Sequence, residues 1–245
     1  MTTVEHVMGM AIVVDVRDAN VGEAAVGDVF DWLRFVDDTF STYKPKSEIC
    51  RIERGELSPE EAHPDVGDVL ERCEQLREDT RGYFDSQAGG SLDPSGLVKG
   101  WAADRAAEIL EDAGARNFAI YAGGDVIVRG RPSAEDRWHV GIRHPHRADR
   151  VAAVVEADDL AIATSGAYAR GDHVLDPHTG LPPSGLLSVT ITGPELATAD
   201  AYATAAFAMG ARGPAWTAQL DGYEAMSILT NETVLSTPRF PAVED

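Results

Sequence analysis

An aspartate and a threonine four residues apart, in Asp200-Ala-Tyr-Ala-Thr204, could together hold a hard metal ion. Residues at this spacing lie over one another on one face of a helix, so the carboxylate and the hydroxyl can point to the same place. Mg²⁺ prefers oxygen ligands and keeps several waters, so two such side chains plus substrate phosphates would make a normal coordination shell. The alternative is that Asp200 places a charge in the first turn of the helix while Thr204 packs. The pair alone leaves both interpretations open.

A candidate general base, His173, opens the segment His173-Val-Leu-Asp-Pro-His-Thr-Gly180. Histidine is the side chain best suited to taking a proton near neutral pH. The nearby Thr164-Ser165-Gly166 adds hydroxyl groups that can donate or accept hydrogen bonds. On the alternative interpretation, the Asp-Pro-His-Thr-Gly stretch is a plain turn capped by Asp176. His178, on the same turn, is then exposed to solvent.

A lysine follows a glycine-rich stretch in Asp93-Pro-Ser-Gly-Leu-Val-Lys-Gly100. The segment lacks the GxxxxGK[ST] pattern of a phosphate-binding P-loop. A glycine-rich loop that leads into a helix still offers free amide groups and a positive dipole end to an anion. Lys99 at that helix entry opposes the dipole unless an anion lies between them. The alternative is a solvated surface lysine.

The elements that position these residues follow from the apolar pattern. Apolar residues three and four positions apart predict helices over 21–38 and 64–81, and further helices are expected over 101–110, 197–209 and 213–220. Short runs rich in β-branched residues predict strands over 10–16, 117–121, 126–129, 138–143, 151–156, 160–164, 187–192 and 226–229. Segment 40–52 is expected to be an ordered loop, and Gly123-Gly124-Asp125 a tight turn. Strands and helices do not alternate strictly and no linker is visible, so we predict one α+β domain over residues 1–245.

The charge of the chain excludes several classes of function. Its 41 acidic and 21 basic residues give a net charge of −20, which repels nucleic acid and anionic lipid surfaces. No apolar run is long enough to span a bilayer, and no export signal is visible, so the expected location is cytoplasmic. Two cysteines, Cys50 and Cys73, are too few for a disulfide framework and are expected to be buried thiols. A phosphate ligand would need local cations, helix ends or a metal.

Taken in order, these segments resemble the ApbE family of FAD:protein FMN transferases. The matching stretches run from Met8 to about Gly210 and are Met8-Gly9, Phe40-Ser-Thr-Tyr43, Ser47-Glu48, Phe84-Asp85, Lys99-Gly-Trp-Ala, Gly123-Gly-Asp125, Thr164-Ser-Gly166, His173-Val-Leu-Asp-Pro-His-Thr-Gly180 and Asp200-Ala-Tyr-Ala-Thr204. The resemblance implies an ApbE-like, T-fold-related arrangement of mixed sheets flanked by helices. It also implies Mg²⁺-dependent transfer of FMN from FAD to a threonine hydroxyl of a partner flavoprotein, with release of AMP.

The resemblance assigns a role to each candidate residue. Asp200 and Thr204 would be the side-chain ligands of Mg²⁺, with the carbonyl of Gly96 as a backbone ligand. His173 falls where the family has a histidine implicated in activating the acceptor. The FAD site would be lined by Met8, Tyr43, Tyr83, Phe84, Asp85, Lys99 and Leu175. Tyr43 or Phe84 could stack on a flavin or adenine ring, the alternative being simple core packing.

The chain departs from the family pattern at three places. Met10 follows Met8-Gly9 where most relatives have threonine, only seven residues separate Asp85 from Asp93, and Asp93-Pro-Ser-Gly replaces the more usual Asp-Leu-Gly-Gly. The short loop leaves one side of the flavin pocket open or differently built. Two other functions stay open at this point. They are an FAD pyrophosphatase that uses the same metal, and a non-catalytic protein that binds FAD.

Overall fold

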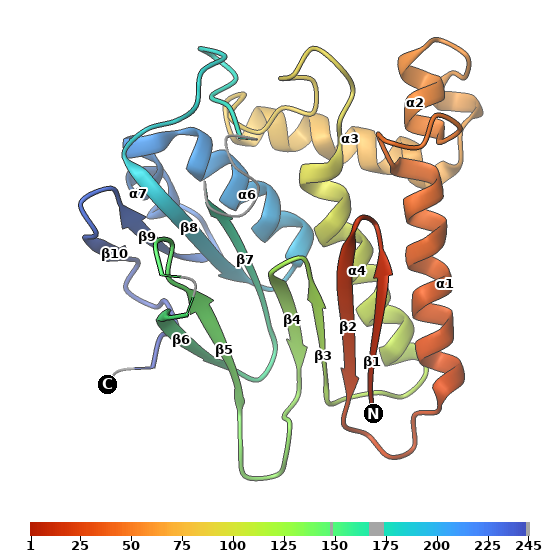
Figure 1. The fold of residues 1–245 in the computed structure, drawn as a ribbon, viewed down its shortest axis with the longest axis vertical. Helices are drawn as coiled ribbons and strands as arrows, with labels where there is room; N and C mark the ends of the chain where they lie inside the picture. The colour runs from red at the N-terminus through yellow and green to blue at the C-terminus, as the bar shows by residue number, and fades with distance from the viewer. Residues whose placement is uncertain (148, 167–173, 244–245) are drawn as a thin grey trace.

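The core of the structure is one eight-stranded antiparallel sheet (Figure 1). The computed structural model describes residues 1–147, 149–166 and 174–243. The strand order across the sheet is β1-β2-β3-β4-β7-β8-β9-β10. These strands are β1 (Thr2–Val7), β2 (Met10–Val16), β3 (Phe118–Ala122), β4 (Asp125–Arg129), β7 (Leu160–Gly166), β8 (Leu186–Gly193), β9 (Glu224–Leu229) and β10 (Val234–Ser236).

The two faces of this sheet carry different cores because side chains alternate along each strand. Phe118 and Ile120 belong to a large core shared with the helices, whereas Ala119 between them belongs to a smaller one. That smaller core is covered by the separate hairpin of β5 (Trp138–Arg143) and β6 (Val151–Ala157). The α+β prediction is therefore confirmed.

The helices that pack on the larger core come from both halves of the chain. They are α1 (Glu23–Phe40), α2 (Glu48–Glu53), α3 (Pro64–Asp79), α4 (Ser95–Asp112), α6 (Leu196–Ala208) and α7 (Gly213–Thr217), with short 3₁₀ turns η1 (Pro59–Glu61) and η2 (Gly210–Arg212). Helix α6 is buried on nearly every side, because small alanines let it pack closely against β7 and β8. None of the helices in these described ranges is both long and apolar enough to cross a membrane.

Two strands and one α-helix are absent from the sequence-based prediction. β1 and β10 are edge strands, and their exposed residues break the apolar pattern; Val4, for example, is 57% exposed. Within the predicted loop over 40–52, α2 begins at Glu48 because the Ser47 hydroxyl accepts a hydrogen bond from the Cys50 amide at 3.1 Å. Cys73 is buried as expected, while Cys50 is half-buried.

The start of α4 is the difference that matters for the site. The helix begins at Ser95, six residues before the predicted start at Trp101. The carboxylate of Asp93 accepts a hydrogen bond from the Ser95 amide at 3.0 Å, and the carbonyl of Pro94 accepts those of Leu97 and Val98. Lys99 therefore lies inside the helix, one turn from its start.

Candidate active site

Three charged side chains from distant parts of the chain meet at one end of α4. The ammonium group of Lys99 lies 2.5 Å from Oδ2 of Asp125, the first residue of β4, and 3.4 Å from Oδ1 of Asp200 on α6. Both carboxylates are almost completely buried, with side-chain exposures of 2% and 6%, whereas 20% of the Lys99 side chain is exposed. The predicted lysine and the predicted metal ligand are thus brought together.

The electrostatics of this cluster hold Lys99 in its charged form. Burial alone would lower the pKa of Lys99, but the carboxylates of Asp200 and Asp125 outweigh it and raise the pKa. One ammonium group and two carboxylates sum to a net charge of −1. The cluster can therefore accept further positive charge.

Two hydroxyl groups join α6 to the end of β7. Thr204, one turn after Asp200 on α6, has its hydroxyl 3.4 Å from that of Ser165 at the end of β7. The neighbouring Thr164 donates its backbone amide to Asp125 at 3.0 Å, which ties β7 to the start of β4. Carboxylate and hydroxyl oxygens of this kind are ligands that suit Mg²⁺. Among the residues that the structure describes, no three histidine, cysteine, aspartate or glutamate side chains gather, so an ion here would need other oxygen ligands, such as backbone carbonyls, waters or phosphate oxygens.

The β3–β4 turn closes over Lys99. Gly123 and Gly124 have φ angles of +61° and +106°, which are accessible to glycine and strained for other residues. A Cβ atom on Gly123 would lie 2.8 Å from the sulfur of Met10 and 3.8 Å from Cδ of Lys99. The sequence analysis identified Asp125 only as part of a glycine turn and missed its place in the cluster. The sequence feature that could have identified Asp125 is its position directly after a Gly-Gly turn.

A second cluster joins the loop after α3 to the 176–180 turn. The ring of Tyr83 packs edge-on against that of His178, with centroids 4.5 Å apart, and the guanidinium of Arg212 lies 5.1 Å from the Tyr83 centroid. Nε2 of His178 lies 3.1 Å from the carbonyl oxygen of Arg81. Asp176 accepts the amide of His178 at 2.9 Å, so the predicted aspartate-capped turn is present.

The other predicted residues occupy varied environments. Tyr43 is 94% exposed, Met8 has a φ of +56° in the β1–β2 turn, and Leu175 is half-buried. The ring of Phe84 is 3% exposed and packs in the larger core next to Gly96, as the alternative interpretation expected, while its contact with FAD stays a prediction.

Gly96 and Asp85 lie at backbone hydrogen-bonding positions. Gly96 is the second residue of α4, where a helical carbonyl normally accepts the amide four residues later. Asp85 accepts the amide of Gln87 at 2.8 Å. His173 lies outside the described residues.

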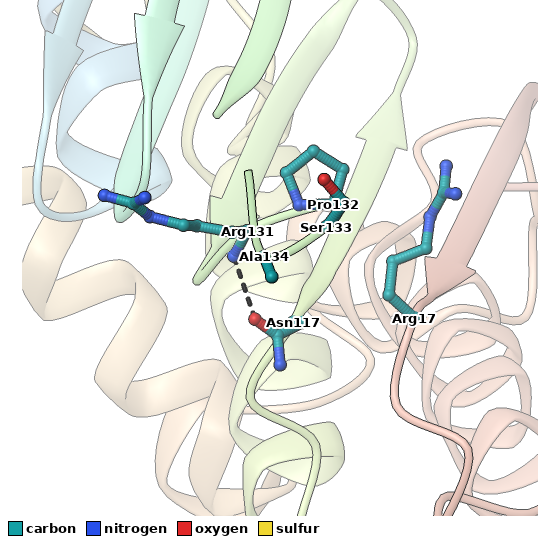
Figure 2. Close-up of a pocket in the computed structure, with 6 residues that line it drawn as sticks. All are labelled: Arg17, Asn117, Arg131, Pro132, Ser133 and Ala134. Atoms are coloured by element: carbon teal, nitrogen blue, oxygen red, sulfur yellow. Dashed lines mark hydrogen bonds between the residues drawn. The ribbon is translucent and has the colours of Figure 1, made fainter. Parts of the chain in front are cut away.

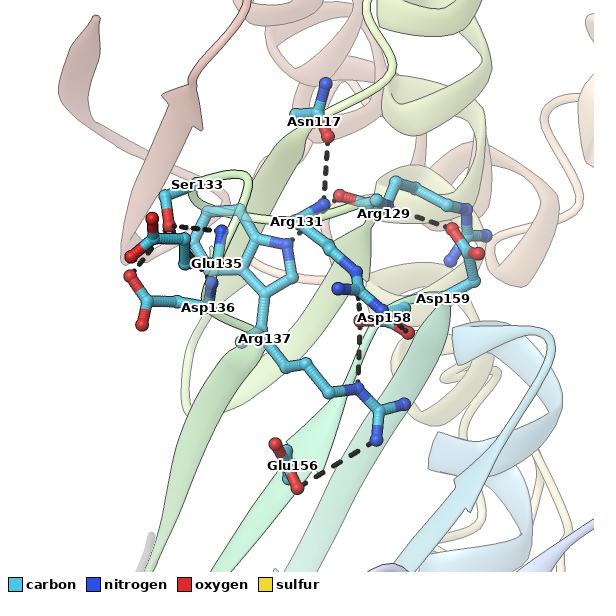
Figure 3. A network of polar contacts seen from close by, with 12 residues as sticks. Asn117, Arg129, Arg131, Ser133, Glu135, Asp136, Arg137, Glu156, Asp158 and Asp159 are labelled. Carbon is cyan, nitrogen blue, oxygen red and sulfur yellow. Dashed lines mark hydrogen bonds and ion pairs between the residues drawn. The ribbon is translucent and has the colours of Figure 1, made fainter.

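A pocket of about 360 Å³ lies away from these residues, at the opposite end of β3 and β4. It is lined by Arg17, Asn117, Arg131, Pro132, Ser133 and Ala134 (Figure 2). The Arg17 and Arg131 side chains extend in different directions (Figure 2). Arg17 pairs with Asp15, and Arg131 pairs with Asp158 (Figure 3). Their charges are thus already compensated, and the pocket has no convergent cations for a ligand.

The ApbE family model matches residues 8–91 and 86–227, which is most of the chain. This chain belongs to the ApbE family. It is 36% identical over 143 residues to the FAD:protein FMN transferase of Treponema pallidum, a match that covers 51% of this chain and 40% of that relative. A match to the enzyme of the same name from Rhodobacter capsulatus is 33% identical over 160 residues and covers 62% and 30%. The aligned part is thus less than half of either relative's length.

Solved ApbE structures share the fold of the whole chain. The flavin transferase ApbE from Vibrio cholerae superposes with a TM-score of 0.88 at 22% identity and covers 99% of both chains. The ApbE protein from Thermotoga maritima gives a TM-score of 0.86 at 22% identity, with 98% and 97% covered. The predicted ApbE-like fold is therefore confirmed.

Proposed function

We propose that this ApbE-family chain is a Mg²⁺-dependent FAD:protein FMN transferase. The observation that carries the proposal is the buried Lys99–Asp125–Asp200 cluster with the Thr204 hydroxyl one turn away. The names of the relatives in Treponema pallidum and Rhodobacter capsulatus support the same activity. The reaction would move FMN from FAD to a threonine hydroxyl of a partner flavoprotein and release AMP.

Asp200 and Thr204 would hold Mg²⁺, with the Gly96 carbonyl as the predicted third protein ligand. When bound, the ion would polarise the phosphorus centre and neutralise charge on the diphosphate. Lys99 adds a fixed positive charge beside the same phosphates, and Asp125 keeps it oriented through the 2.5 Å contact. Phosphoryl transfer depends mainly on such positioning and charge neutralisation.

The covalent change is a substitution at the phosphorus atom of the FMN half. The threonine oxygen forms a new P–O bond, the P–O bond to the AMP half breaks, and AMP leaves with the bridging oxygen. The threonine proton must pass to a base, and His173 is the predicted one. The remaining contacts to FAD would come from Met8, Tyr43, Tyr83, Phe84, Asp85 and Leu175.

Intact-mass measurement tests the proposal. Purified protein is incubated with FAD, Mg²⁺ and a candidate acceptor domain that carries a threonine, and the acceptor should gain the mass of one FMN. Release of AMP with no mass gain would instead indicate an FAD pyrophosphatase in which water replaces threonine. FAD that stays intact for days with Mg²⁺ present would indicate a binding protein without catalysis.

The Asp200→Asn variant tests the ligand assignment. We expect turnover to fall by roughly 100-fold or more, because the ion loses its carboxylate ligand. The free energy of unfolding, measured in urea, should change much less than the activity. Activity with an unchanged Mg²⁺ dependence would show that Asp200 is not a ligand.

A further inference from the structure

Helix α6 lacks a cap of its own. Glu195, the residue before it, makes no side-chain cap, yet the first amides of a helix have no partner within the helix. Those of Leu196 and Ala197 are donated across to α4, to Oδ1 and Oδ2 of Asp104 at 2.9 and 2.7 Å. The start of α6 is thus capped by a side chain more than ninety residues earlier in the sequence.

Gly100 makes this long-range cap possible. It lies one turn before Asp104 on the same face of α4. A Cβ atom there would lie 2.6 Å from the carbonyl oxygen of Leu196 and 2.7 Å from the amide nitrogen of Ala197. Glycine therefore lets the backbone at the start of α6 contact the backbone of α4 directly.

The cap and the active-site cluster share the same two helices. Lys99 adjoins Gly100 on α4, and Asp200 lies one turn beyond Leu196 on α6. The distance of 3.4 Å between Lys99 and Asp200 therefore depends on how α6 is fixed along α4. We propose that Asp104 is a positioning residue that places Asp200 and Thr204 relative to Lys99 for metal and diphosphate binding.

This inference rests on the proposed function, and its test separates the two. Asp104→Asn keeps the size of the side chain but replaces one of its two acceptor oxygens with an NH₂ group. One of the two backbone amides at the start of α6 then faces a donor and loses its hydrogen bond. Asp18 offers a matched control far from the site, because its Oδ2 accepts the amides of Arg116 and Asn117 at 2.8 and 2.7 Å. Asp18→Asn can keep its oxygen on these two amides but turns a donor toward Nδ2 of Asn117, whose hydrogen bond Oδ1 of Asp18 accepts at 2.8 Å. It therefore removes one accepted hydrogen bond, as Asp104→Asn does.

The first readout is binding of Mn²⁺, used as a paramagnetic substitute for Mg²⁺ and followed by electron paramagnetic resonance with FAD present. We expect Asp104→Asn to weaken Mn²⁺ binding at least tenfold and Asp18→Asn to change it less than twofold. Hydrogen exchange should speed up at Leu196 and Ala197 only in Asp104→Asn. Both measurements need no FMN transfer, so they hold even if the chain proves to be a pyrophosphatase.

Three outcomes would overturn the inference. Equal loss of Mn²⁺ affinity in both variants would show that general destabilisation is the cause. Unchanged affinity in Asp104→Asn despite faster exchange at Leu196 and Ala197 would show that the cap is structural only. No Mn²⁺ binding by the unaltered protein would overturn the proposed metal site, and the positioning role with it. If Asp104→Asn does not fold, Asp104→Glu and Asp104→Ser replace it in the test. Asp104→Glu keeps both acceptor oxygens, so its Mn²⁺ affinity must be closer to that of the unaltered protein than the affinity of Asp104→Ser is.

Discussion

Lys99 is the residue on which the buried charges of the site depend. The carboxylate of Asp125 pairs with its ammonium group and Asp125 is 1% exposed, so a neutral side chain at position 99 would remove the positive charge beside this buried carboxylate. The proposed reaction uses the same ammonium group, so a stabilising contact and a substrate contact coincide in one side chain.

We expect Lys99→Met to lower the free energy of unfolding by about 3 kcal/mol, since one partner of a buried ion pair is lost. The double variant Lys99→Met/Asp125→Asn should be more stable than Lys99→Met alone, because one uncompensated carboxylate is gone. Urea unfolding of both variants and of Asp125→Asn gives the coupling free energy between the side chains of Lys99 and Asp125. Additive effects would contradict this account of the pair.

Asp18 and Asp104 should shift stability with pH in opposite directions. Burial raises the pKa of Asp104 to about 6, more than the amides of Ala197 and Leu196 lower it, and Glu195 adds to the rise. Burial would also raise the pKa of Asp18, but hydrogen bonds from Asn117 and Arg116 outweigh it and lower the pKa. Both carboxyls receive two backbone amides, but Asp104 is more deeply buried and Asp18 also accepts a hydrogen bond from the Asn117 side chain at 2.8 Å. These two differences give the pKa shifts opposite signs.

For Asp104, the folded state binds the proton more tightly than the unfolded state, so its contribution is complete below pH 3.8 and lost as pH rises through about 6. The loss is at most about 3 kcal/mol at 1.36 kcal/mol per pKa unit. For Asp18, the contribution is present above pH 3.8 and lost as pH falls. Urea unfolding of each Asn variant between pH 3 and 7 measures both slopes; slopes of the same sign would refute this.

At the scale of elements, the close contact between α4 and α6 is the feature that builds the site. We expect Gly100→Ala to destabilise the protein by about 2 kcal/mol, since the added Cβ meets backbone that cannot rotate away. Gly27 in α1 is the matched control, because nothing lies within 4 Å of its Cβ position. Gly27→Ala should stabilise by about 0.5–1 kcal/mol through helix propensity alone. Thermal unfolding measures the stability of both variants. If Gly100→Ala leaves the stability unchanged, α6 can move away from α4 at little cost in free energy.

The sequence predicted the elements with a strong apolar period and missed those held by local capping. Helix α1 spans Glu23–Phe40 against a predicted 21–38, because its buried positions recur at helical spacing. The start of α4 was missed because Asp93 and Pro94 begin it within a glycine-rich segment. Spacing along one helix was enough to pair Asp200 with Thr204. It could not find Asp125 or Asp104, whose roles arise only when α4, β4 and α6 meet.

At the scale of the whole molecule, the sheet draws on both ends of the chain. Its strands extend from Thr2 to Ser236, and the larger core includes residues from Val7 to Ala225. We therefore propose that residues 1–245 form a single domain. Differential scanning calorimetry should give one transition whose calorimetric and van't Hoff enthalpies agree. Two resolved transitions would contradict it.

The order of strands across the sheet follows their order in the sequence, apart from the β5–β6 hairpin. A nascent chain leaving the ribosome can therefore pair β1 through β4 as each strand emerges. Lys99 and Asp125 are synthesised well before Asp200, which arrives only after β8. A stalled or truncated translation product that ends before α6 thus lacks the second carboxylate, so the charge cluster cannot form until the chain has been synthesised through α6.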